Sequence, residues 1–229
     1  MEPISKAKSL EDKIVALIVD RLDTGDKLPT EKQMIDEFKV SRTALREMLS
    51  IFEASGIITT RQGSGRYVKM PDVGAQIVDS WSIMLKAKPT KLLELAELRA
   101  ILEVHSLPQV LQRINMEQLQ QMNVQVINMK EKAVLGEAFV QEDREFHRIL
   151  AESTGNALLE QLLVAFWDLY ENSKMETQHE NLKEVAAQHE EILDALTKQD
   201  IDRLTMLMEE QFKDSRYRIM VSLMNLGLN

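Results

Sequence analysis

The stretch from Leu28 to Val68 constrains the fold of this 229-residue chain more than any other. It holds two short segments with apolar residues at helical spacing, the second of which opens at Ser41, and then two β-rich runs around Gly63-Ser64-Gly65. Helical spacing gathers apolar side chains on one face, and a glycine turn between β-rich runs is typical of a hairpin. With an apolar-periodic segment before it, this order predicts a winged helix-turn-helix at residues 1–70, made of three helices and a small β-hairpin wing.

Capping residues indicate where the three helices begin. Ser9, Thr30 and Ser41 each precede an apolar-periodic segment, where a side-chain oxygen can accept a hydrogen bond from a backbone N–H of the first turn. Gly56 follows the third segment, at the position where glycine ends many helices. We therefore expect the first helix to run from Ser9 to Leu22 and the third to end just before Gly56.

The sequence after Pro71 predicts helices only. Helical patterns recur near residues 74–87, 91–113, 116–134, 136–153, 156–178, 181–198 and 200–226. Prolines and glycines are few in this part of the chain, which favours an all-α bundle. We expect a mainly α protein, with a linker at residues 71–76 and an all-helical bundle of six to seven helices at residues 77–229.

Composition excludes several functions but leaves DNA binding open. The chain has no cysteine, so it can form neither a disulfide nor a thiolate metal site. No apolar run approaches the ~18 residues that a membrane span needs, and the first residues lack the apolar core of a secretory signal; we expect a cytoplasmic protein with no membrane partner. The net charge of −9 is unevenly distributed: residues 71–229 carry −10, whereas residues 1–70 carry +1. DNA affinity depends on where Lys and Arg cluster.

The third predicted helix carries residue types that read DNA. Its first turns hold Ser41, Arg42, Thr43 and Arg46, with the two arginines four residues apart on one face. A recognition helix contacts base edges from its N-terminal turns. Arginine suits guanine, and threonine suits a thymine methyl group or a phosphate. Two arginines on a helix are often only solvated surface residues. Here they lie at the start of the third helix of a predicted winged helix-turn-helix, with Lys32 in the preceding helix, and this arrangement favours DNA contact.

This ordered set resembles the GntR family of bacterial transcription regulators. The resemblance rests on a series of short motifs, namely Leu28-Pro29-Thr30-Glu31, Val40-Ser41-Arg42-Thr43, Leu45-Arg46-Glu47, Gly56-Ile57-Ile58, Arg61, Gly63, Gly65 and Val68. It implies that a set of residues in the helix-turn-helix faces double-stranded operator DNA, namely Lys32, Ser41, Arg42, Thr43 and Arg46. It also implies that the wing tip, Gln62 and Gly63, enters the minor groove. A single winged domain contacts little DNA, so we expect a homodimer that reads a palindrome.

Asp143, His147 and His189 form a weaker signal in the helical part. Asp143 and His147 are four residues apart on one predicted helix face, and His189 lies on a later helix. Carboxylate oxygen and neutral imidazole are suitable ligands for a zinc-like divalent metal. From spacing alone, an Asp/His pair on a helix is more often a capped or solvated pair.

The helical part resembles the FadR-type subgroup of the same family, whose effector-binding domain is called FCD. The matching segments are Glu97–Glu103, Asp143–Leu150, Thr154–Asn156 and His189–Asp200. The resemblance implies that Asp143, His147 and His189 hold one divalent metal such as Zn or Ni per chain, and that a small carboxylate effector completes its coordination. The family's fourth ligand, a histidine, is replaced here by Gln211. An amide oxygen is a weaker zinc ligand than imidazole, so metal-bound and metal-free forms both stay open.

Arg99 is a further candidate effector-binding residue. Its guanidinium can pair bidentately with an effector carboxylate, or it can form an intrahelical ion pair with Glu103. The sequence therefore predicts a DNA-binding transcription regulator, not an enzyme, whose operator affinity is controlled by a small organic or sugar acid bound next to a divalent metal. Two alternatives stay open: a metal-free regulator of the same family that senses an acyl ligand, and a helix-bundle metalloenzyme whose metal activates water.

Overall fold

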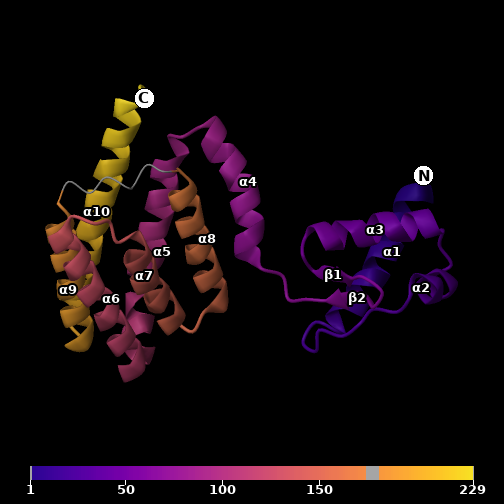
Figure 1. The fold of residues 1–229 in the computed structure, drawn as a ribbon. Helices are drawn as coiled ribbons and strands as arrows, with labels where there is room; N and C mark the ends of the chain where they lie inside the picture. The colour runs from indigo at the N-terminus through magenta and orange to yellow at the C-terminus, as the bar shows by residue number, and fades with distance from the viewer. Residues whose placement is uncertain (1, 174–180, 229) are drawn as a thin grey trace. The chain divides into compact units, whose positions relative to one another are not determined.

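The computed structural model describes residues 2–173 and 181–228. The chain divides into two units, and helix α3 lies at the centre of the N-terminal one, Met1–Asp72. The elements of this unit are α1 (Glu2–Val19), α2 (Glu31–Phe38), α3 (Arg42–Ala54), β1 (Ile58–Arg61) and β2 (Gly65–Val68) (Figure 1). The strands form an antiparallel hairpin in which Ile58 lies opposite Val68. The predicted winged helix-turn-helix is confirmed. Its core combines residues from all three helices and both strands, including Ile14, Met34, Leu45, Leu49 and Ile58.

Two of the predicted caps are present. The Thr30 side chain accepts a hydrogen bond from the backbone N–H of Gln33, whose own side chain accepts from the Thr30 N–H, so that two otherwise unpaired donors are satisfied. Ser41 Oγ accepts from the Ala44 N–H at 3.2 Å. Between these helices Lys39 adopts a left-handed conformation with φ 58°, which turns the chain sharply from α2 into α3.

The first helix differs from its prediction. It begins at Glu2 and ends at Val19, not at Ser9 and Leu22. The segment before Ser9, residues 4–8, contains neither glycine nor proline, so nothing in it stops the helix from continuing toward the N-terminus.

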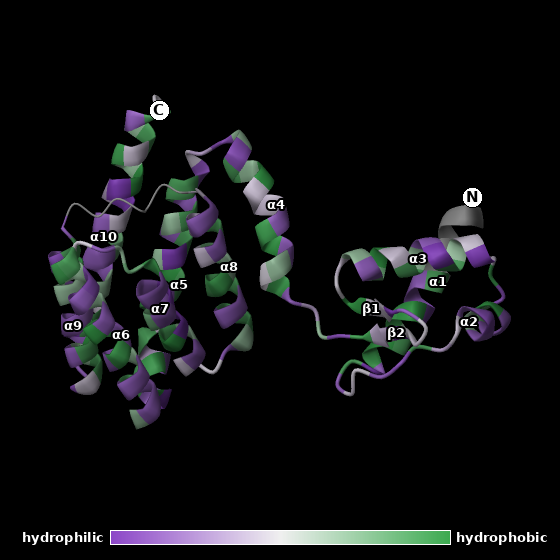
Figure 2. Ribbon diagram, viewed as in Figure 1, coloured by the Kyte–Doolittle hydropathy of each residue, from purple (hydrophilic) through white to green (hydrophobic). Residues whose placement is uncertain are grey.

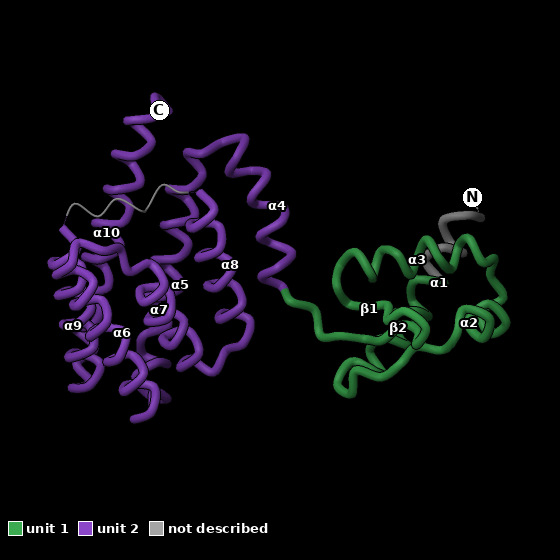
Figure 3. Tube along the Cα trace, in the orientation of Figure 1, with its two compact units in different colours: residues 1–72 green, residues 73–229 purple. Residues whose placement is uncertain are grey.

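The C-terminal unit, Val73–Asn229, contains only helices within its described residues (Figure 3). They are α4 (Val73–Ala87), α5 (Lys91–Arg113), α6 (Met116–Leu135), α7 (Val140–Ser153), α8 (Ala157–Ser173), α9 (Leu182–Thr197) and α10 (Ile201–Asn225). The predicted fold class, a winged helix-turn-helix followed by a bundle of six to seven helices, is confirmed. No helix in the described part of the chain is long and apolar enough to cross a membrane.

Two boundaries differ from the predicted ones, and a third lies outside the described residues. Helix α4 begins at Val73, inside the segment predicted as a linker. The predicted helix at 136–153 begins only at Val140, because Gly136 takes a left-handed conformation that closes α6. Of the predicted helix at 156–178, residues 174–178 lie outside the described residues.

The C-terminal unit has two hydrophobic clusters, and α5 and α10 contribute to both. Leu92 and Leu95 of α5 belong to one cluster, and Leu107 and Val110 of the same helix belong to the other. Arg99 and Glu103 lie between them along α5 and are also buried. Figure 2 shows polar and apolar residues mixed along the helices of this unit. Buried charges need partners to compensate for lost hydration, so Arg99 and Glu103 require polar partners inside the helical core.

The winged core supplies a direct test of the fold. Leu49 is fully buried in α3, whereas Ile51 on the same helix is 60% exposed. We expect Leu49→Ala to lower the free energy of unfolding of the N-terminal unit by about 2–5 kcal/mol, and Ile51→Ala to change it by about 0.5 kcal/mol or less. Hydrogen exchange of the α3 amides measures both values.

The two tryptophans, Trp81 and Trp167, lie in the C-terminal unit and provide the control. Their fluorescence transition in urea should stay unchanged in both variants. Equal losses for Leu49→Ala and Ile51→Ala would contradict the described core.

Candidate functional site

The residues predicted to contact DNA are all exposed on the N-terminal unit. They lie at the start of α2, across the first turns of α3 and at the tip of the hairpin, and are Lys32, Ser41, Arg42, Thr43, Arg46, Gln62 and Gly63. Gly63 has φ +73°, a conformation that glycine adopts without strain and that closes the short turn between the strands. The surface therefore presents two arginines and a lysine together with the N-terminus of α3.

Arg46 is oriented by a carboxylate from the neighbouring helix. Its Nε donates to both oxygens of Glu31, at 2.9 and 3.2 Å. Within the described residues its terminal nitrogens make no hydrogen bond, and its side chain is 58% exposed. Those two nitrogens form the edge of the guanidinium that pairs bidentately with guanine. Glu31 therefore holds Arg46 in place and leaves the outer edge of its guanidinium free for another partner.

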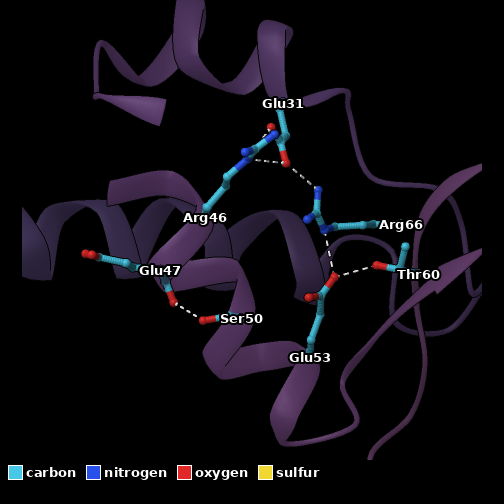
Figure 4. A network of polar contacts seen from close by, with 7 residues as sticks. All are labelled: Glu31, Arg46, Glu47, Ser50, Glu53, Thr60 and Arg66. Carbon is cyan, nitrogen blue, oxygen red and sulfur yellow. Dashed lines mark hydrogen bonds and ion pairs between the residues drawn. The ribbon is translucent and has the colours of Figure 1, made fainter. Parts of the chain in front are cut away.

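Glu31 belongs to a network that also includes the wing (Figure 4). Arg66 of β2 donates from Nη1 to Glu31 at 2.9 Å and from Nε to Glu53 of α3 at 2.7 Å. Thr60 of β1 also donates to Glu53. Burial alone would raise the pKa of Glu31, but Arg66 and Arg46 hold that pKa below its ordinary value. The hydrogen bond from Thr60 and the nearby Arg66 likewise lower the pKa of Glu53.

In the C-terminal unit, the predicted metal and effector residues line one small internal cavity. Asp143 and His147 come from α7, His189 from α9, Gln211 from α10 and Arg99 from α5. The cavity has a volume of about 20 Å³, which suffices for a single water molecule or ion but not for an organic acid. The structure therefore brings together all five residues that the sequence singled out in this unit.

Asp143, His147 and His189 converge as a donor set for a cation. Three of their potential ligand atoms lie within 4.8 Å of one another. Asp143 Oδ1 is 2.6 Å from His189 Nε2 and 3.7 Å from His147 Nε2. His189 donates from Nδ1 to the carbonyl of Val185 at 2.8 Å, so its Nε2 carries the lone pair when the ring is neutral. A carboxylate oxygen and that lone pair repel each other at 2.6 Å, and a proton or a metal cation between them removes the repulsion.

A second carboxylate orients His147 from behind. Its Nδ1 lies 2.6 Å from Glu103 Oε2, and its Nε2 faces Asp143. Burial alone would raise the pKa of Glu103, but Arg99 and His147 hold that pKa below its ordinary value, so Glu103 accepts as a carboxylate and His147 donates. A carboxylate behind a histidine is the usual support of a metal ligand.

Gln211 lies beside this donor set and lines the same cavity. Its Nε2 lies 2.9 Å from His189 Nε2, while its Oε1 is buried and has no hydrogen-bond partner among the described residues. The amide nitrogen of Gln211 faces His189 in this arrangement, and a half-turn of the amide would place its oxygen, a ligand that divalent cations accept, on that side. The residues present therefore fit a metal, with Gln211 as a weaker fourth ligand than histidine.

Arg99 takes the ion-pair arrangement that the sequence left open. Its Nε donates to Glu103 Oε1 at 2.6 Å, and its guanidinium lies 3.9 Å from the ring centroid of Trp167. A stacked and paired arginine is stabilised in a buried position by both contacts. Arg99 still lines the cavity, so the ion pair leaves it beside the predicted effector site.

Four further residues belong to these sites although the sequence predicts no site role for them. Glu103 is expected only as a partner of Arg99, and no role is expected for Arg66, Glu53 or Arg218. Arg218 of α10 lines the inner cavity and also an open groove of about 470 Å³ between α9 and α10. Its Nε is buried without a partner among the described residues. Arg218 follows Gln211 by seven residues, which is two helical turns, so the spacing alone places both side chains on the same face of α10.

Comparison with known proteins agrees with both units. Residues 6–68 match the family described as "Bacterial regulatory proteins, gntR family", and residues 94–214 match the FCD domain. The "Uncharacterized HTH-type transcriptional regulator YcbG" of Bacillus subtilis is 32% identical, with 93% of this chain and 90% of the relative covered. The "Uxu operon transcriptional regulator" of Escherichia coli is 27% identical, with 96% and 90% covered. The solved structure of Streptococcus agalactiae GntR has the same fold, with a TM-score of 0.67, 24% identity, and 92% of this chain and 99% of that chain covered.

The chain belongs to the GntR family of regulatory proteins and carries an FCD domain. It is a DNA-binding transcription regulator. Since the matched family and the named relatives are regulators rather than enzymes, the metalloenzyme alternative is not supported.

The buried charges of α5 give a testable stability difference. Glu103→Gln leaves Arg99 without its counter-ion inside the core, and we expect the free energy of unfolding of the C-terminal unit to fall by about 3–5 kcal/mol. The control is Glu94→Gln on the same helix. Glu94 is exposed and pairs with Lys91, and the loss of that pair should cost about 1 kcal/mol or less. Urea denaturation followed by tryptophan fluorescence measures both. Similar small losses in the two variants would show that the buried pair is not needed for stability.

Proposed function

We propose that this regulator binds operator DNA as a homodimer and that a small carboxylate, bound next to a divalent metal in the helical unit, controls its operator affinity. The convergence of Asp143, His147 and His189 at a cavity that Gln211 also lines supports the effector half of this proposal. The exposed cations Lys32 of α2, Arg42 and Arg46 of α3, and Arg61 of the wing support the proposal that this unit binds operator DNA.

The DNA-reading role falls to α3 and the wing. Arg42 and Arg46 present their guanidinium groups from the first two turns of α3, which is the part of a recognition helix that reaches base edges. Lys32 lies at the start of α2 and would contact phosphate. Gln62 and Gly63 would enter the minor groove, where the absence of a side chain at Gly63 permits close approach. Two such units related by a two-fold axis would read a palindromic operator.

The metal would be held by Asp143, His147 and His189, with Gln211 in the fourth position. A bound divalent cation would supply a positive centre for an effector carboxylate. Zn or Ni suits two imidazoles and a carboxylate. Gln211 would weaken that site relative to a third histidine, so we expect reversible metal binding rather than a permanently bound ion.

The effector would lie where the inner cavity meets the groove between α9 and α10. The inner cavity alone is too small for an organic acid, but it shares Val185 and Arg218 with the larger groove. An acid would therefore reach the metal from this side and contact Arg218, whose Nε has no partner among the described residues. Arg99 would be a second cation near the acid's carboxylate.

One observation favours the metal-free alternative within the same family. The Nε2 atoms of Gln211 and His189 lie 2.9 Å apart, so the amide can donate to the histidine and satisfy it without a cation. In that form the helical unit would sense a larger acyl ligand through the α9–α10 groove. Metal binding decides between the two forms.

Operator binding is the first test. We expect Arg46→Ala to weaken binding by roughly 1–3 kcal/mol because a bidentate base contact is lost. The DNA is a duplex selected from a random-sequence library by the wild-type protein, and affinity is measured by gel shift. Arg21→Ala removes an arginine that pairs with Asp20 and belongs to none of α2, α3 and the wing; it is the control and should bind as wild type does. Unchanged affinity in Arg46→Ala would remove its proposed role.

Metal binding is the second test. We expect Zn²⁺ to raise the melting temperature of the wild-type protein, since a ligand that binds only the folded state stabilises it. His189→Ala should lose this rise, and Gln211→His should reach it at about tenfold or more lower Zn²⁺ concentration, as expected for a restored imidazole ligand. His105→Ala removes an exposed histidine of α5 and should behave as wild type does.

A screen of small carboxylates with and without Zn²⁺ then distinguishes the two forms. A carboxylate that raises the melting temperature only in the presence of Zn²⁺ supports the metal-dependent form. No response to Zn²⁺ in the wild-type protein would leave the metal-free form as the better account.

A further inference from the structure

The wing strand carries an arginine that contacts one carboxylate on each of the DNA-reading helices, Glu31 of α2 and Glu53 of α3. We propose that Arg66 is a positioning residue for operator recognition: it acts through Glu31 to fix the orientation of Arg46, and it does not itself contact DNA. This inference rests on the DNA-reading role proposed above for Arg46.

The geometry of Arg66 leaves its functional groups turned inward. Its Nη1 donates to Glu31 and its Nε donates to Glu53, at 2.9 and 2.7 Å, and its side chain is 24% exposed. Arg61 on the same hairpin differs: it is exposed and stacks over Tyr67 at 4.3 Å. Of these two wing arginines, Arg61 is placed to reach DNA, and Arg66 is placed to hold protein groups together.

The contacts of Glu31 show how Arg66 can influence Arg46. Glu31 Oε1 accepts from both arginines, while its Oε2 accepts from Arg46 and from no other described residue. One carboxylate held by two guanidinium groups has a fixed plane, and that plane sets the direction of the Arg46 Nε–H bond. Without Arg66 the carboxylate can rotate with Arg46, and the free edge of Arg46 loses its defined direction.

A double-mutant cycle tests this inference on the full-length protein. The variants are Arg46→Ala, Arg66→Met and the double variant, and the probes are the selected duplex and a random-sequence duplex. We expect Arg66→Met to weaken binding to the selected duplex about tenfold, in line with the loss of a charged hydrogen bond, and to change binding to the random duplex by about twofold or less. In the Arg46→Ala background the same substitution should have an effect of about twofold or less on either duplex, because residues acting through one contact are non-additive.

Salt dependence distinguishes positioning from direct contact. The slope of log affinity against log salt should match wild type in Arg66→Met, because no phosphate contact is lost. Arg66→Lys keeps the charge but not the fork that reaches both carboxylates, and should lie between wild type and Arg66→Met. Arg21→Met is the matched control, since the Arg21 side chain is also 24% exposed, and it should bind both duplexes as wild type does.

Three results would overturn the inference. The first is an additive loss of DNA affinity in the double variant. The second is an equal loss of affinity for both duplexes in Arg66→Met, with the slope of log affinity against log salt reduced in magnitude by about 0.9. The third is wild-type affinity in Arg66→Met. If Arg66→Met unfolds the N-terminal unit, the cycle is run with Arg66→Lys and the same criteria apply. If the wild-type protein selects no duplex at all, the proposed function fails; if it selects one and the cycle is additive, only the role of Arg66 fails.

Discussion

The helical unit depends on one buried charge pair, Arg99 with Glu103. Placing two charges between two hydrophobic clusters costs hydration free energy, which their mutual attraction offsets only when further partners satisfy the remaining groups. Here those partners are Trp167, which stacks under the guanidinium, and His147, which donates to the second carboxylate oxygen. The position of His147, and with it the geometry of the cavity, therefore follows from a pair on a different helix.

The winged unit uses the same principle at its surface. A carboxylate, Glu31, is held by two arginines and fixes the one that faces outward. In both units the group that would contact a ligand is flexible on its own, and a carboxylate on a neighbouring element restricts it. The difference is exposure: the pair on α5 is buried, whereas Arg46 is more than half exposed and keeps its terminal nitrogens unbonded among the described residues.

Local patterns were sufficient to predict most of the fold and part of the site. The caps at Thr30 and Ser41, the helical periodicities and the glycine turn of the wing are signals within a few residues of one another, and the structure has those elements. The Asp143–His147 spacing likewise put two cavity residues on one helix face. Partners that are distant in sequence were not predictable in this way, because Glu103 and His147 are 44 residues apart and Glu31 and Arg66 are 35 apart. The start of α1 was misplaced because a good capping residue, Ser9, is followed by helix but not preceded by any break.

Helix α10 connects the cavity to the whole length of the C-terminal unit. It has 25 residues, which at the helical rise corresponds to about 37 Å, and it contributes to both hydrophobic clusters as well as to the cavity wall. Its Gln211 and Arg218 lie near the middle of this rod. A tilt of about 5° around that point displaces each end by about 1–2 Å. A change too small to see at the cavity would thus be largest at the two ends of α10, so spectroscopic labels near Ile201 and Asn225 would report cavity filling better than any label beside the cavity itself.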